Sequence, residues 1–468
     1  MPALARAAAA VLLAAVTLRA AAEAPPPDLL LDRLIAESLA VRPEVKQAQA
    51  TVSAEQERIP QAGALPDPVL TLGIQNDGFN GLQIGKMETS YYQVMVTQGL
   101  PWPGKRDKRS DVARLAAKQA ETGLSRLRLT TEADVRRAYL ELLVARERLS
   151  LLDRLEAIWQ KSIATVRARY ETGEGAQSDL LRAQLELNRL RQRRWSLQAE
   201  EATKIQALNR LRARPLDEPI PTTVRPSELP VPPVPGIEEA VADAEARSPE
   251  LAGARLDAAQ AEAQVDLAKV ERFPDLGVNL GIMPRGSLEP MWLASVSIGL
   301  PIWSGRKQGK AVEETKARSA ASAQGAEAVA QVLRLRVAER RAALASLAET
   351  IQLYREGLLL QSRATTESTL SQYRVGKVTF ASVLEANAGY IGDEEGHLLA
   401  VADAQKLAIA SAEVSLERTG VTGGGAMGGT SLPGAGPSGG ASMGGSRGGG
   451  TAAPAAAPAA SAGASSSM

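Results

Sequence analysis

The chain has 468 residues and a formal net charge of +1, so its charge does not indicate nucleic acid or an acidic substrate as a partner. Aromatic residues make up only 3%, a composition that suits long helices better than one thick sandwich or barrel. Cysteine is absent, which excludes disulfides, thiolate metal sites and lipid attachment to cysteine.

The first 24 residues have the pattern of a secretion signal. Arg6 precedes an apolar stretch over residues 7–18, and the alanines at 20–22 supply small residues for cleavage. This stretch is too short to cross a bilayer, so we expect residues 1–24 to be a signal peptide, with an uncleaved anchor as the alternative. No later segment has ~20 consecutive apolar residues, so a helical membrane protein is not expected.

Two stretches of the chain, residues 43–209 and 249–413, repeat each other in altered form. The matching motifs are Pro43-Glu44 with Pro249-Glu250, Pro66-Asp67 with Pro274-Asp275, and Tyr170-Glu171-Thr172-Gly173 with Tyr373-Arg374-Val375-Gly376. A period of about 200 residues is too long for a solenoid unit, so the sequence predicts a duplicated module. We expect a first repeat over 25–213, a proline-rich linker over 214–236 and a second repeat over 237–420.

Each repeat contains two short runs that alternate between apolar and polar residues. The expected strands cover about 69–75 and 90–99 in the first repeat, and about 276–282 and 291–300 in the second. In the first run Leu70, Leu72 and Ile74 share one face, whereas Thr71 and Gln75 share the other. A period of two is typical of strands, so each repeat is predicted to contain a β-hairpin.

Helices are expected on both sides of each hairpin. Shorter helical segments come first, at about 32–60 and 237–272, and very long helices follow, at about 105–170 and 306–373. In the first long helix, apolar residues recur every three or four positions, as in a coiled-coil seam. At 1.5 Å per residue this helix is about 100 Å long. After the motif Tyr-x-x-Gly, a further helix of roughly 35–40 residues is expected to run back.

Four strands with one apolar face pose a physical problem. They are too few to close a barrel, and an open sheet edge is not tolerated in lipid. If the apolar face meets lipid, several chains must contribute to one sheet. Three chains would give twelve strands, which lies inside the range of outer-membrane barrels. The alternative is a small soluble sheet that lies on the coiled coil.

The whole pattern resembles the TolC-like outer-membrane factor family, the exit ducts of bacterial efflux and secretion pumps. The resemblance covers about residues 30–416, and rests on the duplication, on the hairpin before each long helix, and on Tyr-x-x-Gly followed by Ser178-Asp179-Leu180-Leu181 or Ser382-Val383-Leu384-Glu385. It implies a mostly α-helical fold with a small β part, in which a homotrimer forms a twelve-stranded outer-membrane barrel continuous with a periplasmic coiled-coil tunnel.

The same resemblance implies the partners and the location. A periplasmic adaptor would dock on the tunnel tip and connect it to an inner-membrane pump, for which the RND type is expected. Outer-membrane lipid of a Gram-negative bacterium would surround the barrel, and a large part of the chain would be periplasmic.

By resemblance, the residues after the two tip turns form the tunnel gate. Glu385 matches an acidic position that rings the narrowest point, whereas Ser382 replaces a second acid found in the family. Tyr373 and Asp179 match a pair that latches the closed state, but Val378 stands where a basic residue often joins that latch. The residues expected to contact the adaptor are Tyr170, Gly173, Ser178, Leu180, Gly376, Thr379 and Leu384.

Each gate residue also has a plainer interpretation. A ring of carboxylates in a narrow passage would attract cations and repel anions, but Glu385 could also be an ordinary solvated helix residue. Tyr373 could be an apolar plug under its turn. Gly173 and Gly376, the glycines of the two turns, most simply supply a positive φ at helix ends. The arginines near 189–194 are expected to form a solvated, ion-paired helix face, and no nucleic acid is expected as partner.

The cargo is inferred from similarity to one branch of the family. Residues 98–106, preceded by Leu65-Pro66-Asp67-Pro68, are most similar to the heavy-metal branch (CzcC-like and CusC-like). We therefore expect passive conduction of heavy-metal cations. Drugs or other small molecules, or a type I secretion duct of the same fold, are the alternatives, and a secreted coiled-coil scaffold or adaptor without a pore is the alternative of another class.

Other signals point away from catalysis. No phosphate loop, nucleophile elbow or zinc motif appears, so no enzymatic activity, cofactor or bound metal is expected. His397, the only histidine, is expected on the surface, and the eight methionines show no ligand spacing. Residues 421–468 are rich in Gly, Ala, Ser and Pro, which predicts a disordered tail.

Overall fold

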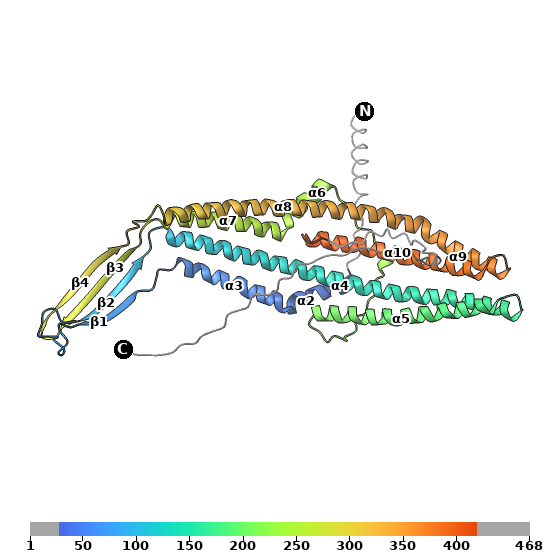
Figure 1. Ribbon diagram of the computed structural model, residues 1–468, viewed down its shortest axis with the longest axis horizontal. Helices are drawn as coiled ribbons and strands as arrows, with labels where there is room; N and C mark the ends of the chain where they lie inside the picture. The colour runs from blue at the N-terminus through green and yellow to red at the C-terminus, as the bar shows by residue number, and fades with distance from the viewer. Residues whose placement is uncertain (1–27, 419–468) are drawn as a thin grey trace, which may run out of the picture. The chain divides into compact units, whose positions relative to one another are not determined.

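The computed structural model describes residues 28–418, which are mostly helical with one small sheet (Figure 1). The expected fold class, mostly α with a small β part, is confirmed. The predicted signal peptide over 1–24 and the predicted tail over 421–468 lie outside the described residues. Among residues 28–418, no helix is both long and apolar enough to cross a membrane.

The first repeat contains four helices and one β-hairpin. Its elements are α2 (Leu29–Val41), α3 (Pro43–Gly63), β1 (Val69–Gln75), β2 (Tyr91–Leu100), α4 (Lys105–Glu171) and α5 (Gln177–Leu211). Asp28 caps α2 by accepting hydrogen bonds from the Leu30 and Leu31 amides at 3.1 and 3.4 Å. The helical segment expected over 32–60 is thus split in two, because the residue before Pro43 is kept out of the helical conformation.

The second repeat has the same order of elements after a short linker helix. The linker helix is η1 (Pro226–Glu228), and the elements of the repeat are α6 (Ile237–Arg247), α7 (Pro249–Val270), β3 (Leu276–Arg285), β4 (Leu288–Ile298), α8 (Gln308–Leu353), η2 (Tyr354–Leu358), α9 (Leu359–Arg374) and α10 (Phe380–Glu413). Pro249 starts α7 just as Pro43 starts α3, so the segment expected over 237–272 is split in the same way.

The second hairpin is tighter than its sequence suggests. Its strands continue to Arg285 and resume at Leu288, whereas the alternating pattern predicts strands that end at 282 and begin at 291. The turn needs only two residues because Gly286 adopts a φ of +66°. In the first hairpin, a long loop over residues 76–90 separates β1 from β2.

The four strands form one antiparallel sheet in the order β1-β2-β3-β4. The central pair joins the two repeats, with Val94 opposite Ile282 and Thr97 opposite Asn279. The Thr97 hydroxyl donates to the Asn279 side-chain oxygen at 2.8 Å, which fixes this register. β1 and β4 are the outer strands, and neither has a second partner strand among residues 28–418.

The two faces of the sheet differ in chemistry. The even-numbered face is apolar and exposed: it carries Leu70, Leu72, Ile74, Tyr92, Val94, Val96, Leu280, Ile282, Trp292, Val296 and Ile298. The odd-numbered face carries many polar residues, among them Thr71, Gln93, Thr97, Asn279 and Ser295. The sheet therefore presents an uncovered apolar surface that no helix of residues 28–418 buries.

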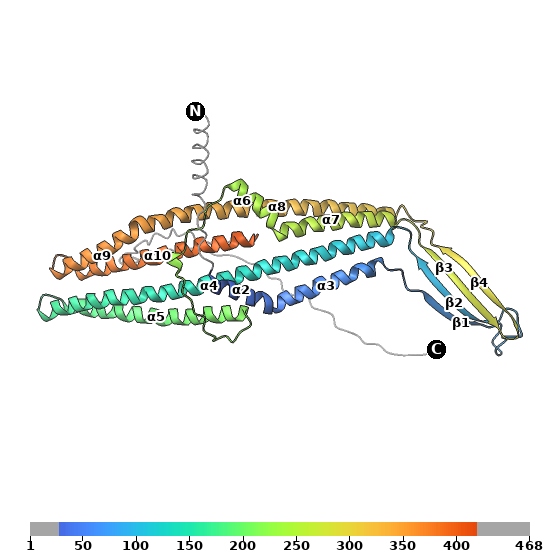
Figure 2. The same ribbon diagram turned by 180° about the vertical axis from the view of Figure 1, so that it is seen from behind.

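α4 is the element against which most of the other helices pack. It contacts α3 and α7 along the part that follows the sheet, and α5 and α10 along the rest (Figures 1 and 2). Val135 and Leu142 of α4 are fully buried against Leu34 of α2 and Leu208 of α5. Each such side chain contributes about 1.5–3 kcal/mol through burial, so this part of the apolar seam of α4 stabilises the first repeat.

Contacts between the two repeats fix the junction at which β2 of the sheet leads into the long helix α4. The buried Lys105 donates to an Asp275 carboxylate oxygen and to the Phe273 carbonyl oxygen, each at 2.7 Å. Asp275 also accepts from the Trp102 amide at 2.9 Å, and the Trp102 and Phe273 rings stack with centroids 5.3 Å apart. These contacts give Asp275, the aspartate of the second proline-aspartate motif, a structural role at the junction between the repeats.

The second long helix, expected to run unbroken over 306–373, is interrupted by the π-helical turn η2. Tyr354 of this turn lies against His397 of α10, with ring centroids 6.1 Å apart. His397 is buried, so the expectation of a surface histidine is wrong. Arg355 donates to its Nε2 atom at 3.4 Å and to the linker carbonyls of Ser227 and Leu229, each at 3.2 Å.

Gly396 allows this packing, and its neighbour Gly392 provides a matched control. A Cβ on Gly396 would meet the Tyr354 hydroxyl and lie 3.0 Å from its ring, whereas a Cβ on Gly392 meets nothing within 4 Å. We expect Gly392→Ala to stabilise the protein by about 0.5–1 kcal/mol, because alanine favours the helix. Gly396→Ala should lack this gain or destabilise, as measured by thermal unfolding. Equal gains in both variants would contradict the π-turn packing.

Burial lowers the pKa of His397 below its ordinary value of 6.5, and the charge of Arg355 lowers it further, against the opposing charge of Glu394. The unfolded chain therefore binds more protons below about pH 6.5, and the stability due to neutral His397 is lost as the pH falls through the folded pKa. We expect His397→Gln to reduce the loss in melting temperature between about pH 7 and pH 5. An unchanged pH profile would contradict this prediction.

Candidate functional site

The turn between α4 and α5 and the turn between α9 and α10 lie at the ends of the long helices remote from the sheet (Figure 1). Gly173 and Gly376 have φ of +77° and +74°, the left-handed conformation that glycine adopts without strain. The Lys377 amide donates to the Gln372 carbonyl at 3.0 Å, and the Glu174 amide donates to the Arg169 carbonyl at 2.9 Å. The two turns are thus built alike, as the repeated motif predicts.

An apolar cluster packs the two helical hairpins together behind these turns. The buried cluster consists of Trp159, Val166, Ala183, Tyr373, Phe380 and Val383. The first three belong to the first repeat, and the last three belong to the second. The Tyr373 and Phe380 rings lie 5.5 Å apart. Leu180 and Leu384 are half-buried against this cluster, so the structure places these two expected contact residues largely inside the tip.

The structure brings Tyr373 and Asp179 together. The Tyr373 hydroxyl donates to an Asp179 carboxylate oxygen at 3.2 Å, which connects the second repeat to the first. Burial raises the pKa of Tyr373, and the Asp179 carboxylate raises it further. The tyrosine therefore stays protonated and able to donate. It is both a buried ring of the cluster and a hydrogen-bond donor, so the two interpretations of this residue are compatible.

Arg169 is the basic residue of this contact, and it was not among the residues expected from the sequence. Its guanidinium carbon lies 4.9 Å from the centre of the Tyr373 ring, and the side chain donates to the Tyr373 and Glu174 carbonyl oxygens. Val378, at the position where a basic residue is expected, packs instead against the apolar cluster. The sequence feature that points to Arg169 is its position directly before the first Tyr-x-x-Gly motif.

The other expected tip residues are accessible in the single chain. Tyr170, Gly173, Ser178, Gly376 and Thr379 are all exposed. The exposed Val375 has 68% of its surface accessible, which adds an apolar side chain that was not expected from the sequence. These residues form the exposed rim of the two turns, the position at which a partner could bind.

Glu385 is exposed on α10 and lines a groove of about 420 Å³ between α5 and α10. Glu186, Arg189 and Arg193 also line it. Arg189 is ion-paired with Glu186, and Arg193 with Glu395 across the groove. Arg189 and Arg193, two of the arginines near 189–194, are therefore part of an ion-paired helix face. Ser382 is half-exposed, and its hydroxyl lies 3.3 Å from that of Thr379.

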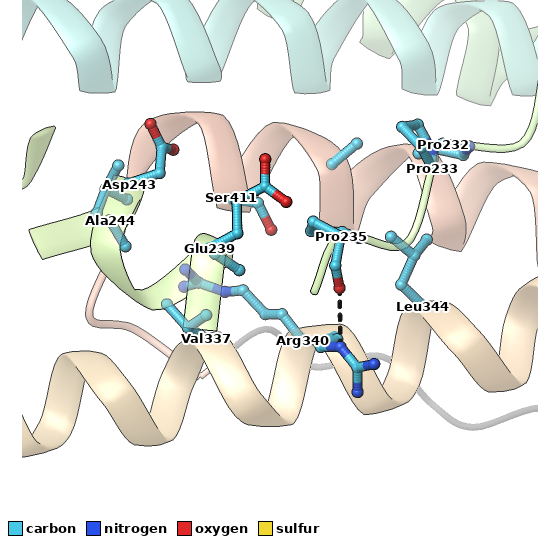
Figure 3. A pocket seen from close by; sticks show the side chains of 14 residues that line it. Pro232, Pro233, Pro235, Glu239, Asp243, Ala244, Val337, Arg340, Leu344 and Ser411 are labelled. Atoms are coloured by element: carbon cyan, nitrogen blue, oxygen red, sulfur yellow. Dashed lines mark hydrogen bonds between the residues drawn. The ribbon is translucent and has the colours of Figure 1, made fainter. Parts of the chain in front are cut away.

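A second cavity, of about 320 Å³, lies between the linker, α6, α8 and α10 (Figure 3). Arg341 closes one side by donating to the Pro235 carbonyl at 2.9 Å. The walls of this cavity include Pro232, Val337 and Leu344, and Arg340 also lines it. Burial lowers the pKa of Arg340. No group of three or more His, Asp or Glu side chains suited to holding a metal ion occurs among residues 28–418.

Comparison with known proteins decides the family. The sequence profile of the family described as "Outer membrane efflux protein" matches residues 34–213 and 240–415. This chain belongs to that family. Each matched segment of this outer membrane efflux protein contains one β-hairpin, a long helix and the helix that runs back. The resemblance found in the sequence is thereby confirmed. No curated protein sequence matches the chain.

Solved structures show the same fold at low sequence identity. CusC is 19% identical, with a TM-score of 0.69 over 82% of this chain and 92% of that one. VceC from Vibrio cholerae is 16% identical, with a TM-score of 0.67 over 82% and 95%. The open state of MtrE from Neisseria gonorrhoeae is 19% identical, with a TM-score of 0.68 over 82% and 88%. CusC is described in terms of transmembrane channel formation, MtrE as an outer-membrane channel and VceC as an outer-membrane protein.

The hydrogen bond between Tyr373 and Asp179 can be tested by substitution, with Tyr170, at the equivalent position of the other turn, as a matched control. We expect Tyr373→Phe to lower the free energy of local opening at the tip by about 1 kcal/mol, because a hydrogen bond is lost. Hydrogen exchange of the Gly376 and Lys377 amides should become about five-fold faster. Tyr170→Phe, at the exposed equivalent position, should have no such effect.

A double-mutant cycle separates this bond from general packing. If the hydroxyl acts through Asp179, Tyr373→Phe should add little in an Asp179→Ala background, which lacks the acceptor, and the coupling energy should be about 1 kcal/mol. Strictly additive effects would show that the two side chains do not depend on each other.

Proposed function

We propose that this protein is the outer-membrane exit duct of a tripartite efflux system, in which three copies share one twelve-stranded barrel. The observation that carries the proposal is the amphipathic sheet. Its apolar face is uncovered, with Leu72, Trp292 and Val296 between 69% and 81% exposed, and its two outer strands have open edges among residues 28–418.

Open edges and an apolar face together favour assembly within lipid. Each unpaired backbone group in hydrocarbon costs several kcal/mol, so β1 of one copy must pair with β4 of the next until the sheet closes. The twelve strands from three copies match the even numbers found in outer-membrane barrels, which have apolar outer and polar inner faces. In this arrangement the odd-numbered face of the sheet lines the pore.

The helices also leave apolar residues for a neighbouring copy. Leu181, Leu185 and Trp195 are 58%, 49% and 68% exposed, and their spacing places them along one side of α5. Leu353 and Leu360, seven positions apart on α8 and α9, are 58% and 68% exposed. Contact between such stripes on adjacent copies would close a helical tunnel in the periplasm, beneath the barrel.

The remaining parts of the proposal concern partners and cargo. The exposed rim around Tyr170, Val375 and Thr379 would bind a periplasmic adaptor, which connects the duct to an inner-membrane pump of the RND type. We propose heavy-metal cations as cargo, conducted passively, because residues 98–106 are most similar to the heavy-metal branch. Conduction of drugs or other small molecules, or of a type I secretion substrate, would need no change in this architecture. The organism would be Gram-negative.

Fractionation distinguishes a duct from a secreted scaffold without a pore. The mature protein should remain in outer-membrane fractions and migrate as a trimer in unheated gel samples. A protein that is fully soluble after cell lysis would contradict the proposal.

Cation preference in planar bilayers tests the acidic ring. Glu385→Gln should lower the cation-to-anion permeability ratio at least about two-fold, because one carboxylate per copy is removed from the narrowest passage. Glu57→Gln, an exposed position on α3, serves as the control and should leave the ratio unchanged. If both variants conduct with the preference of the wild type, Glu385 does not form the selective ring.

A further inference from the structure

The odd-numbered face of the sheet brings together three methionines that are far apart in the sequence. Met283 is directly opposite Met291, and Met95 is directly opposite Gly281. Gly281 precedes Met283 by two residues on the same strand, so Met95 and Met283 are diagonal neighbours on one face. These are three of the four methionines among residues 28–418, and the fourth, Met87, lies in the loop between β1 and β2.

The Met95 side chain extends over Gly281, and its sulfur lies near Gln93, whose position faces Met283 on the neighbouring strand. Gly281 has no side chain, and the Met95 Cβ and Cγ atoms lie over it, each 3.5 Å from the position that a Cβ on that glycine would occupy. The Gln93 side-chain amide donates to the Met95 sulfur at 3.8 Å. Val94 is opposite Ile282, so Gln93 lies beside Met283 on the facing strand.

Strand geometry allows the three thioethers to reach a common point. Directly opposed residues have Cβ atoms about 4.5–5.5 Å apart, and diagonal neighbours are about 7–8 Å apart, which long side chains can span. Each of the three side chains is half-exposed, so an ion from solution could reach them. Arg285, the nearest cation on this strand, donates to the Glu289 and Glu88 backbone carbonyl oxygens at 2.8 and 3.3 Å.

The surroundings do not resemble an apolar core. The adjacent row on this face consists of Thr97, Asn279 and Ser295, which are joined by hydrogen bonds of 2.8 and 3.2 Å. Leu293, opposite Gly281, is the large aliphatic neighbour of the methionines. Flexible, polarisable thioethers on a largely polar face, outside a packed interior, are therefore available to a ligand.

We propose that Met95, Met283 and Met291 form a binding site for soft monovalent cations, copper(I) or silver(I). Thioether sulfur is a soft ligand that selects such ions over zinc or magnesium. The sulfurs carry no charge, so they would bind a passing ion without holding it permanently, as conduction requires. The location of the site inside a pore rests on the proposed function, whereas the binding itself does not.

Silver(I) titration of the purified full-length protein in detergent and chloride-free buffer tests the site. The variant Met283→Leu/Met291→Leu removes two sulfurs with little change in volume. Wild type should bind one more silver ion per chain than this variant, or bind it at least about ten-fold more tightly. X-ray absorption should show sulfur neighbours that the variant lacks. Met87→Leu is the matched control and should behave as wild type.

The possible outcomes distinguish a failure of the proposed metal site from a failure of the proposed duct. Equal silver affinity and equal sulfur coordination in wild type and in the double variant would overturn the proposal. Zinc(II) binding that depends on the same methionines would also contradict it, because the ligands would then not select soft ions. A monomer in detergent that still binds silver through these sulfurs would refute the trimeric duct and leave the site intact.

Discussion

An unpaired strand edge in hydrocarbon leaves backbone N–H and C=O groups without hydrogen bonds, and this cost constrains the whole assembly. The described part of the chain, residues 28–418, supplies only four strands, yet their even-numbered residues form an uncovered apolar face. In the proposed barrel, lipid covers that face, but it cannot pair the edges of β1 and β4. The proposed trimer pairs these edges with those of other copies, to which the duplicated module contributes two hairpins per copy.

The helices depend on the same duplication. α4 packs against helices of both repeats, and Lys105 at its start binds Asp275 of the second repeat. At the other end, Tyr373 binds Asp179 of the first repeat. The two repeats are thus connected both where the sheet begins and at the tips. The length of the long helices separates the tip contact from the sheet and its junction.

Periodicity was enough to predict most of the fold. The alternation of Leu70, Leu72 and Ile74 with polar residues marks a strand, and the structure has β1 over Val69–Gln75. The apolar seam of the first long helix predicts α4 in the same way. The second hairpin was harder to delimit, because Pro284 interrupts the alternation and is unusual in a strand. The register is indeed irregular between Met283 and Arg285.

Contacts between distant segments could not be obtained from spacing. His397 was expected on the surface, but the π-turn places Tyr354 and Arg355 beside it. Arg169 joins the Tyr373 contact from the other repeat. The three methionines showed no ligand spacing because they belong to three strands, and only the register of the sheet brings them to one face. The pairing of Tyr373 with Asp179 was inferred from family resemblance alone.

The most direct test asks whether β1 of one copy pairs with β4 of another. The chain has no cysteine, so paired substitutions such as Thr71→Cys with Leu293→Cys, Ser295→Cys or Ser297→Cys can be oxidised without competing thiols. For at least one register, the account predicts covalent dimers and trimers in outer-membrane fractions, with nothing larger. Only monomers, at every register and under oxidising conditions that form control disulfides, would contradict the shared barrel.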